Sequence, residues 1–298
     1  MRYPKSPLVP VLMAVLLCAC LWTGCNQGTT TESTLNLDSL AVPDAVGGSD
    51  AEAANLPSPV QMALSILNSK APYNGELLNP ATKADAYSNT FAQAINLGIY
   101  QADLGYLIAH HQTQGALDYF RAVKKLGDKM GIFGAFEDSM MERAEKHLDS
   151  RDSLFAILSE AFQNADVYLN ENAMMASADL IVAGGWLEST YIATQILKTH
   201  DSGQLRKRIG DDKLVLPELL AALEAHKDSK DHLALAGHFR ELNTLYGEIK
   251  IKRDSKAAET DQDKKVTKIK SQTKVRYTKE TLAKITDKVA AIRKIYVN

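Results

Sequence analysis

The sequence predicts an all-α protein: a multi-helix bundle or array of two related four-helix units, with a C-terminal helix docked against them. Three observations predict this fold. Apolar residues recur at helical spacing through most of residues 58–298, one long segment is apolar around most of its circumference, and several short sequence matches recur in the same order. We therefore expect 58–298 to form a single all-helical domain.

The first helix is expected at residue 59, because Ser58-Pro59 is typical of a cap followed by proline at the first helical position. A longer helix is expected to begin at residue 82 or 83, and its apolar stripe runs from Tyr87 to Gly98. Residues 154–165 give another amphipathic face. Segment 174–198 is apolar nearly all round, which indicates a central buried helix.

The evidence for two related units lies in paired motifs about 79 to 85 residues apart. Asp149-Ser-Arg-Asp-Ser-Leu reappears as Asp228-Ser-Lys-Asp-His-Leu, and Asp103-x-x-Tyr106 matches Glu188-x-x-Tyr191. We interpret these as two copies of a four-helix unit over 83–172 and 172–250; chance agreement between helical sequences is the alternative. Asp149 and Asp228 are expected to be helix N-caps, each with a second Asp three residues on.

The chain becomes strongly basic after residue 250. Residues 251–277 hold few large apolar side chains, so a solvated basic loop is expected, with a short hairpin of the alternating segments 266–270 and 273–277 as an alternative. The basic segment could instead contact anionic lipid or lipopolysaccharide. Thr278 is expected to cap a last helix, 278–297, whose apolar seam should dock on the other helices; the seam consists of Leu282, Ile285, Val289, Ile292 and Ile295.

The N-terminus has the pattern of an export signal. Arg2 and Lys5 precede an apolar run from Leu8 to Leu21, which is shorter than the roughly 20 residues that a membrane span needs. Trp22-Thr23-Gly24-Cys25 follows this run and resembles the bacterial lipobox, in which a cysteine is lipidated and becomes the mature N-terminus. The resemblance implies a signal peptide over 1–24 and a lipid on Cys25, with Cys20 as the second choice.

Lipidation would explain the cysteine usage. The chain has three cysteines and none after Cys25, so the processed protein would hold no thiol for a disulfide, a zinc site or a nucleophile. Residues 25–57 are polar and acidic with no basic residue, which predicts a flexible tether between the lipid and the domain. The formal charge of −2 would become −4 without residues 1–24, which argues against nucleic acid as a partner.

One candidate polar centre stands out. Segments 96–106 and 183–191 both place glycines inside an expected helix, and both carry a carboxylate three residues before a tyrosine. If the duplication holds, the two pairs could face each other across a pseudo-twofold interface. The candidate ligand-binding residues are Tyr100, Asp103, Tyr106, Trp186, Glu188 and Tyr191. The alternative is a structural core in which the tyrosine hydroxyls satisfy the carboxylates.

The sequence contains no recognisable catalytic motif. It has no G-x-S-x-G, no Walker glycine loop, no dinucleotide fingerprint and no H-E-x-x-H. His226, His232 and His238 recur every six residues, a spacing that does not place neighbours on one helix face, so all seven histidines are expected at the surface. We expect no catalytic residue and no cofactor, and the sequence does not identify a metal.

From residue 58 onward the chain resembles a group of all-helical bacterial lipoproteins without an assigned activity. SPVQMALSILNSKAPYNGELLNP, NLGIYQADLGYL and AGGWLESTYIA carry this resemblance, which implies fold and location only. The duplicated helical bundles of imelysin-like proteins are a second comparison. Their Gly-x-His-x-x-Glu motif is missing, because Gly185-Trp-Leu-Glu188 has no histidine.

These patterns together predict a non-enzymatic lipoprotein of the bacterial envelope, attached to the bilayer, most readily the outer membrane, through its N-terminal lipid. Its helical domain would bind or interact with another protein of the envelope. The alternative function is binding of a small ligand or a metal ion at the centre around Asp103 and Glu188.

Overall fold

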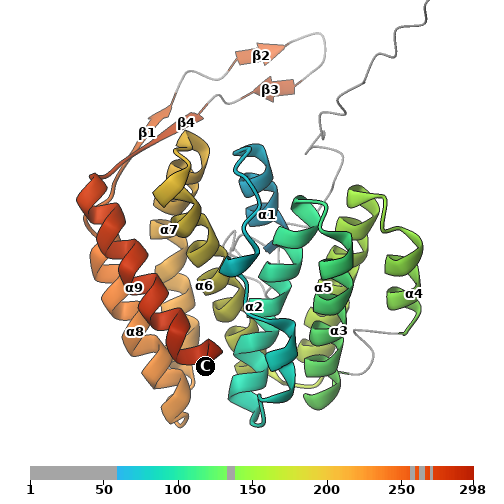
Figure 1. The fold of residues 1–298 in the computed structure, drawn as a ribbon. Coiled ribbons are helices and arrows are strands. Elements are labelled where there is room, and N and C mark those ends of the chain that lie inside the picture. Colours follow the sequence, from blue (N-terminus) through green and yellow to red (C-terminus); the bar gives the residue numbers. More distant parts are fainter. Residues whose placement is uncertain (1–58, 133–137, 256–258, 262–265, 269–270) are drawn as a thin grey trace, which may run out of the picture. The chain divides into compact units, whose positions relative to one another are not determined.

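The computed structural model describes residues 59–298, except 133–137, 256–258, 262–265 and 269–270 (Figure 1). The predicted signal peptide (1–24), the tether (25–57) and Cys25 therefore lie outside the described residues. The prediction of an all-α array is confirmed, since most of the described chain is helical. The elements are α1 (Pro59–Asn68), η1 (Gly75–Leu77), η2 (Ala81–Asp85), α2 (Thr90–Ala109), α3 (Thr113–Lys129), α4 (Asp138–Lys146), α5 (Arg151–Glu171), α6 (Met175–Thr199), α7 (Gly203–Ala225), α8 (Lys230–Tyr246), β1 (Lys250–Ser255), β2 (Glu259–Asp261), β3 (Val266–Lys268), β4 (Ser271–Arg276) and α9 (Lys279–Val297), where η marks a 3₁₀-helix.

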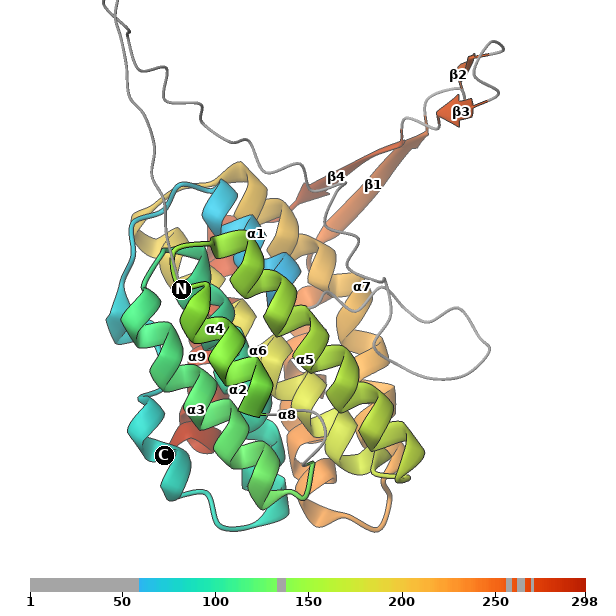
Figure 2. The same cartoon turned by 90° about the vertical axis from the view of Figure 1, so that its right-hand side faces the viewer.

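Helices α2 and α6 pack against each other at the centre of the array, and the other helices surround them. Nearly every residue of α2 from Gln93 onward is buried, and α6 is buried around most of its circumference, as the apolar pattern of 174–198 predicts. Helices α3 and α5 pack on α2, while α7 and α9 pack on α6, and α8 lies against α7 and α9 (Figures 1 and 2). None of the described helices combines the length and the apolar character needed to span a bilayer.

Several helix starts differ from the expected ones. Residues 81–85 form the short helix η2, and α2 begins only at Thr90, because Asn89 caps it by accepting a hydrogen bond from the Ala92 N–H. The N-caps of α5 and α8 are Ser150 and Ser229, not Asp149 and Asp228. A serine hydroxyl one residue later reaches the orphan N–H of the first turn equally well.

The second unit has three helices where four were expected, since 172–250 contains α6, α7 and α8. The turn between α7 and α8 also brings two histidines together. His226 caps the end of α7 and His232 lies in the first turn of α8, with their rings 4.7 Å apart. The expectation that all histidines are exposed is therefore wrong, because His232 is buried and its Nε2 bonds to the Ala176 carbonyl. The six-residue spacing misleads because a turn interrupts the helix.

Strand pairs replace the expected basic loop. Strand β1 pairs with β4 and β2 pairs with β3, both antiparallel, so the described part of 250–276 is a hairpin built of two short ladders. Figure 2 shows β1 and β4 extending away from the helices. The alternative of a hairpin between 266–270 and 273–277 is also wrong in its pairing, because β3 pairs with β2 and β4 pairs with β1.

Helix α9 begins as predicted, with the Thr278 hydroxyl accepting a hydrogen bond from the Thr281 N–H. Ile285, Val289 and Ile292 of the predicted seam are buried. Ile295 is 54% exposed, so its inclusion in the seam is wrong. Residues on one face of a helix recur every three to four positions, so the face that contains Val289 also contains residues 293 and 297. Residue 295 lies on another face and is exposed to solvent.

Candidate functional site: a buried acid pair closed by Arg293

The candidate site lies beside the place where α2 and α6 touch through their backbones. A Cβ atom on Gly98 would lie 1.9 Å from the carbonyl oxygen of Ile181, and a Cβ on Gly184 would lie 2.0 Å from that of Ile95. Each helix therefore needs glycine where the other helix passes. The two helices use the same Ile-x-x-Gly motif for this contact, so the contact is reciprocal.

The reciprocal contact relates residues 86 positions apart, since Ile95 and Gly98 correspond to Ile181 and Gly184. With this shift Asp103 corresponds to Ser189 rather than to Glu188. The two carboxylates are therefore neighbours across the interface, but they are not equivalent positions about the crossing.

Asp103 and Glu188 are both completely buried, with 0% of each residue exposed. Asp103 Oδ2 accepts a hydrogen bond of 3.1 Å from the Asn79 N–H, while Oδ1 has no donor within hydrogen-bond geometry. Burial raises the pKa of Asp103 well above its ordinary value, and the neighbouring Glu188 carboxylate raises it further. Burial and the neighbouring carboxylate therefore both favour the protonated, neutral form of Asp103.

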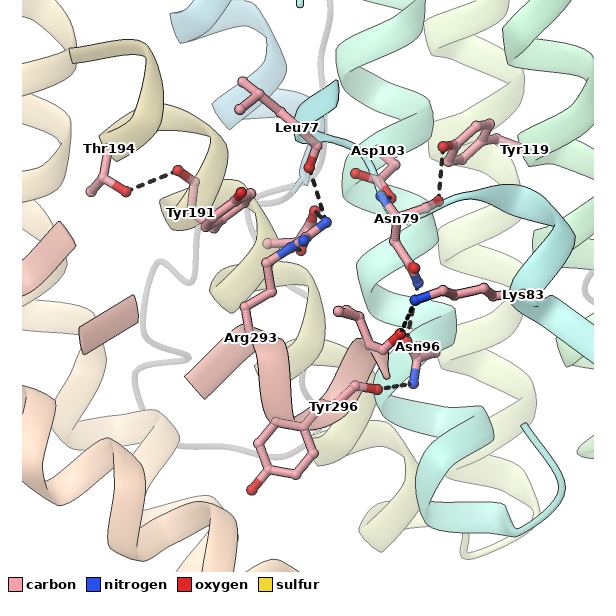
Figure 3. A network of polar contacts seen from close by, with 12 residues as sticks. Leu77, Asn79, Lys83, Asn96, Asp103, Tyr119, Tyr191, Thr194, Arg293 and Tyr296 are labelled. Carbon is pink, nitrogen blue, oxygen red and sulfur yellow. Dashed lines mark hydrogen bonds and ion pairs between the residues drawn. The ribbon is translucent and has the colours of Figure 1, made fainter. Parts of the chain in front are cut away.

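Arg293 of α9 neutralises Glu188. Its Nε and Nη2 donate to the two oxygens of the Glu188 carboxylate, each at 2.6 Å, which is the two-point geometry that guanidinium and carboxylate prefer (Figure 3). Nη2 also donates to the Leu77 carbonyl at 2.9 Å, and the guanidinium lies 4.2 Å from the ring centre of Tyr191. The pKa of Arg293 is raised by Glu188 against the opposing effect of burial, so it stays charged.

The tyrosines of the candidate set do not satisfy the carboxylates. Tyr106 accepts a hydrogen bond from the Asn74 N–H at 2.9 Å, and Tyr100 donates to the Pro80 carbonyl at 2.9 Å. Tyr191 contributes the face of its ring to Arg293 rather than its hydroxyl to Glu188. The tyrosines thus hold the segment 74–80 and the arginine in place, and Glu188 is compensated by a cation instead.

Trp186 is directed to a second buried carboxylate. Its ring packs against Phe239 and Tyr246 of α8, 5.3 Å and 6.4 Å away between ring centres. Asp212 of α7 is completely buried near the same indole, and burial raises its pKa to about 6 despite the nearby Arg208 guanidinium. Trp186 and Tyr100 of the candidate set therefore lie in different surroundings, because Tyr100 packs against Tyr87 and Tyr119.

The end of α9 is fastened beside the acid pair. Asn96 donates to the Tyr296 carbonyl at 2.9 Å, and Lys83 Nζ donates to the Val297 carbonyl at 2.8 Å (Figure 3). These carbonyls are among the last four of a helix, which have no partner within the helix itself. Together with Arg293, they attach the last turns of α9 to α2 and to η2.

Chemically, the arrangement is that of an internal ion pair and a neutral acid. Both oxygens of Glu188 accept hydrogen bonds from Arg293, so a metal ion would have to displace the guanidinium, and an anionic ligand would have to displace the Glu188 carboxylate. Within the described ranges, no group of three or more His, Cys, Asp or Glu side chains is arranged to hold a metal ion. Comparison of the chain with known protein families, curated proteins and solved structures gives no match to any of them.

Arg293 and Asp212 are the residues that the sequence reasoning missed. Arg293 could have been found from Ile285 and Val289, because residues 285, 289 and 293 follow at intervals of four on one helix face. A buried face that includes an arginine needs a buried acid nearby. Asp212 could have been found in the same way, because position 212 continues the apolar stripe of Leu205, Ile209 and Leu216 at intervals of three or four.

Proposed function

We propose that this protein is a lipid-anchored, non-enzymatic binding protein of the bacterial cell envelope. Support for the anchor comes from Trp22-Thr23-Gly24-Cys25 directly after an apolar run, and from the absence of any later cysteine in the sequence. The first described helix begins at Pro59, so 33 residues would separate a lipid on Cys25 from the helical domain. A flexible chain of this length reaches about 30 Å from the membrane.

The observation that carries the non-enzymatic part of the proposal is the Glu188–Arg293 pair. The most polar region of the core is engaged in attaching α9 to α2 and α6, and a catalytic acid or base must instead meet its substrate. The Glu188–Arg293 pair then holds α9 in place. An envelope partner would bind the outer surface of the helices and strands.

Metabolic labelling with a fatty acid tests the anchor. We expect the wild-type chain and Cys20→Ala to incorporate label, and Cys25→Ala to incorporate none. Label that is retained in Cys25→Ala and lost in Cys20→Ala would move the attachment to Cys20. An unlabelled wild-type chain would overturn the proposal.

The alternative is a small-ligand or metal-binding protein that uses the same centre. The unpartnered Oδ1 of the buried Asp103 favours it, because a ligand that accepts a hydrogen bond from the protonated carboxyl would satisfy this atom. Thermal denaturation against divalent metal ions and polar metabolites tests it. A ligand whose stabilisation disappears in Asp103→Ala would support the alternative, and one whose stabilisation persists would exclude this site.

A further inference from the structure

The outer face of the β1/β4 ladder carries four cations. Lys250 is paired with Arg276 and Lys252 with Lys274, and all four residues are exposed. Residues directly opposite in an antiparallel pair share a face, and so do residues two apart on one strand. These four side chains, which we call the basic face, therefore project from the same side of the ladder.

The opposite side of the ladder faces the helices. Ile251 and Val275 are paired between the two cationic pairs and are partly buried. Val275 packs against α7 where Gly210 leaves room, since a Cβ on Gly210 would lie 1.9 Å from Val275 Cγ1. This contact places the side of the ladder that carries Ile251 and Val275 against the helices. The basic face lies on the opposite side and therefore points to solvent.

The charge of the chain is segregated into this segment. Residues 250–276 hold ten Lys or Arg and four Asp or Glu, a balance of +6 in a chain whose total is −2, so the remainder carries −8. The basic face thus belongs to a positively charged segment of a chain that is negative elsewhere, and an anionic surface is attracted to it.

We propose that the basic face, Lys250, Lys252, Lys274 and Arg276, binds the anionic phospholipid headgroups at a membrane surface. Neighbouring cations along a strand are about 7 Å apart and those across the ladder about 5 Å, a two-dimensional array suited to a layer of phosphates. The face holds no aromatic side chain on which a nucleic-acid base could stack. The negative remainder of the chain would orient the ladder toward an anionic bilayer and the helices away from it.

This proposal goes beyond the lipid anchor and does not require it. Helix α1, the first described element, packs on α7, and β4 packs on the same helix. A tether that enters at α1 would therefore hold the ladder near the membrane. A single lipid chain with a basic patch binds a membrane more firmly than either alone.

Vesicle sedimentation with the chain 25–298 carrying Cys25→Ser tests the proposal in the absence of a lipid and of the apolar leader. Vesicles contain phosphatidylcholine alone or with about one third phosphatidylglycerol, and each cation near an anionic surface strengthens partitioning roughly fivefold at low salt. We expect binding to the anionic vesicles only, weakened as salt is raised. Replacing all four basic-face residues with glutamine should reduce partitioning at least ~50-fold.

The matched control changes the net charge by the same amount elsewhere, with glutamine at four exposed lysines of the helical part: Lys70, Lys146, Lys198 and Lys227. Its partitioning into anionic vesicles should lie within about threefold of that of the parent, because these cations do not lie on the ladder. The basic-face variant should melt within a few degrees of the parent, since all four side chains are exposed. Equal loss in both variants, equal binding to neutral vesicles, or displacement from vesicles by single-stranded RNA would each overturn the proposal.

Discussion

Arg293 and Glu188, 105 residues apart in the chain, form a two-point ion pair that attaches the last helix, α9, to the central helix α6. The pair is almost completely removed from solvent, with 11% and 0% of the two side chains exposed. A buried pair of this kind adds little net stability compared with apolar residues of the same size, but loss of one partner leaves an uncompensated charge in the core.

Arg293→Met should therefore destabilise the protein by about 3–5 kcal/mol, because it leaves the Glu188 carboxylate buried without a cation. The double variant Glu188→Met/Arg293→Met should recover at least half of this loss, since no charge remains unpaired. Chemical denaturation of both variants measures the effect. A double variant that is less stable than Arg293→Met would show that the pair contributes through something other than charge compensation.

The crossing of α2 and α6 predicts that Gly98→Ala and Gly184→Ala each cost at least ~2–3 kcal/mol, because the new methyl group meets a backbone carbonyl that cannot move without its helix. Gly237 of α8 is the matched control, since nothing lies within 4 Å of a Cβ added there. Gly237→Ala should be neutral or stabilise by up to ~1 kcal/mol. Thermal melts of the three variants compare them, and similar melting temperatures for all three would contradict the close approach of the helices.

The buried carboxylate of Asp212 predicts a dependence of stability on pH. Its pKa rises from 3.8 to about 6 on folding, so the unfolded chain loses this proton first as the pH increases. The free energy of unfolding therefore decreases progressively between about pH 4 and pH 6, by about 2–3 kcal/mol in all. Asp212→Asn lacks this titration, so its stability relative to the wild type should improve over that range. A constant difference between the two proteins from pH 4 to pH 7 would rule out the raised pKa.

The sequence predicts the central elements of the fold well, because an apolar surface on all sides can only belong to a buried helix. Segment 174–198 is such a case, and α6 covers residues 175–199. Thr278 is also predicted as a cap, because neither of its chain neighbours, Tyr277 and Lys279, is a residue type that caps helices. Residues 149 and 150, in contrast, both have side chains that can cap a helix, and only the backbone geometry selects the serine.

The candidate site is predicted in part. A carboxylate beside a glycine in an apolar helix indicates a buried polar group, which is how Asp103 and Glu188 can be recognised. Their partner cannot be recognised in the same way, because Arg293 is one of 34 Lys and Arg residues and lies 105 positions from Glu188. The pairing of β1 with β4 could not be predicted from the sequence either. The segment packs on a distant part of the chain, through the contact between Val275 and Gly210 of α7.

The central claim is that the core holds one charged pair, Glu188 with Arg293, and one neutral acid, Asp103. The most direct test is the free energy of unfolding at pH 7 of Asp103→Asn and Glu188→Gln. Asparagine has the size and hydrogen-bonding groups of the neutral acid, so Asp103→Asn should lie within about 1 kcal/mol of the wild type. Glu188→Gln leaves Arg293 without its counter-charge and should cost about 3 kcal/mol or more. Equal losses in the two variants, or a larger loss in Asp103→Asn, would contradict the account.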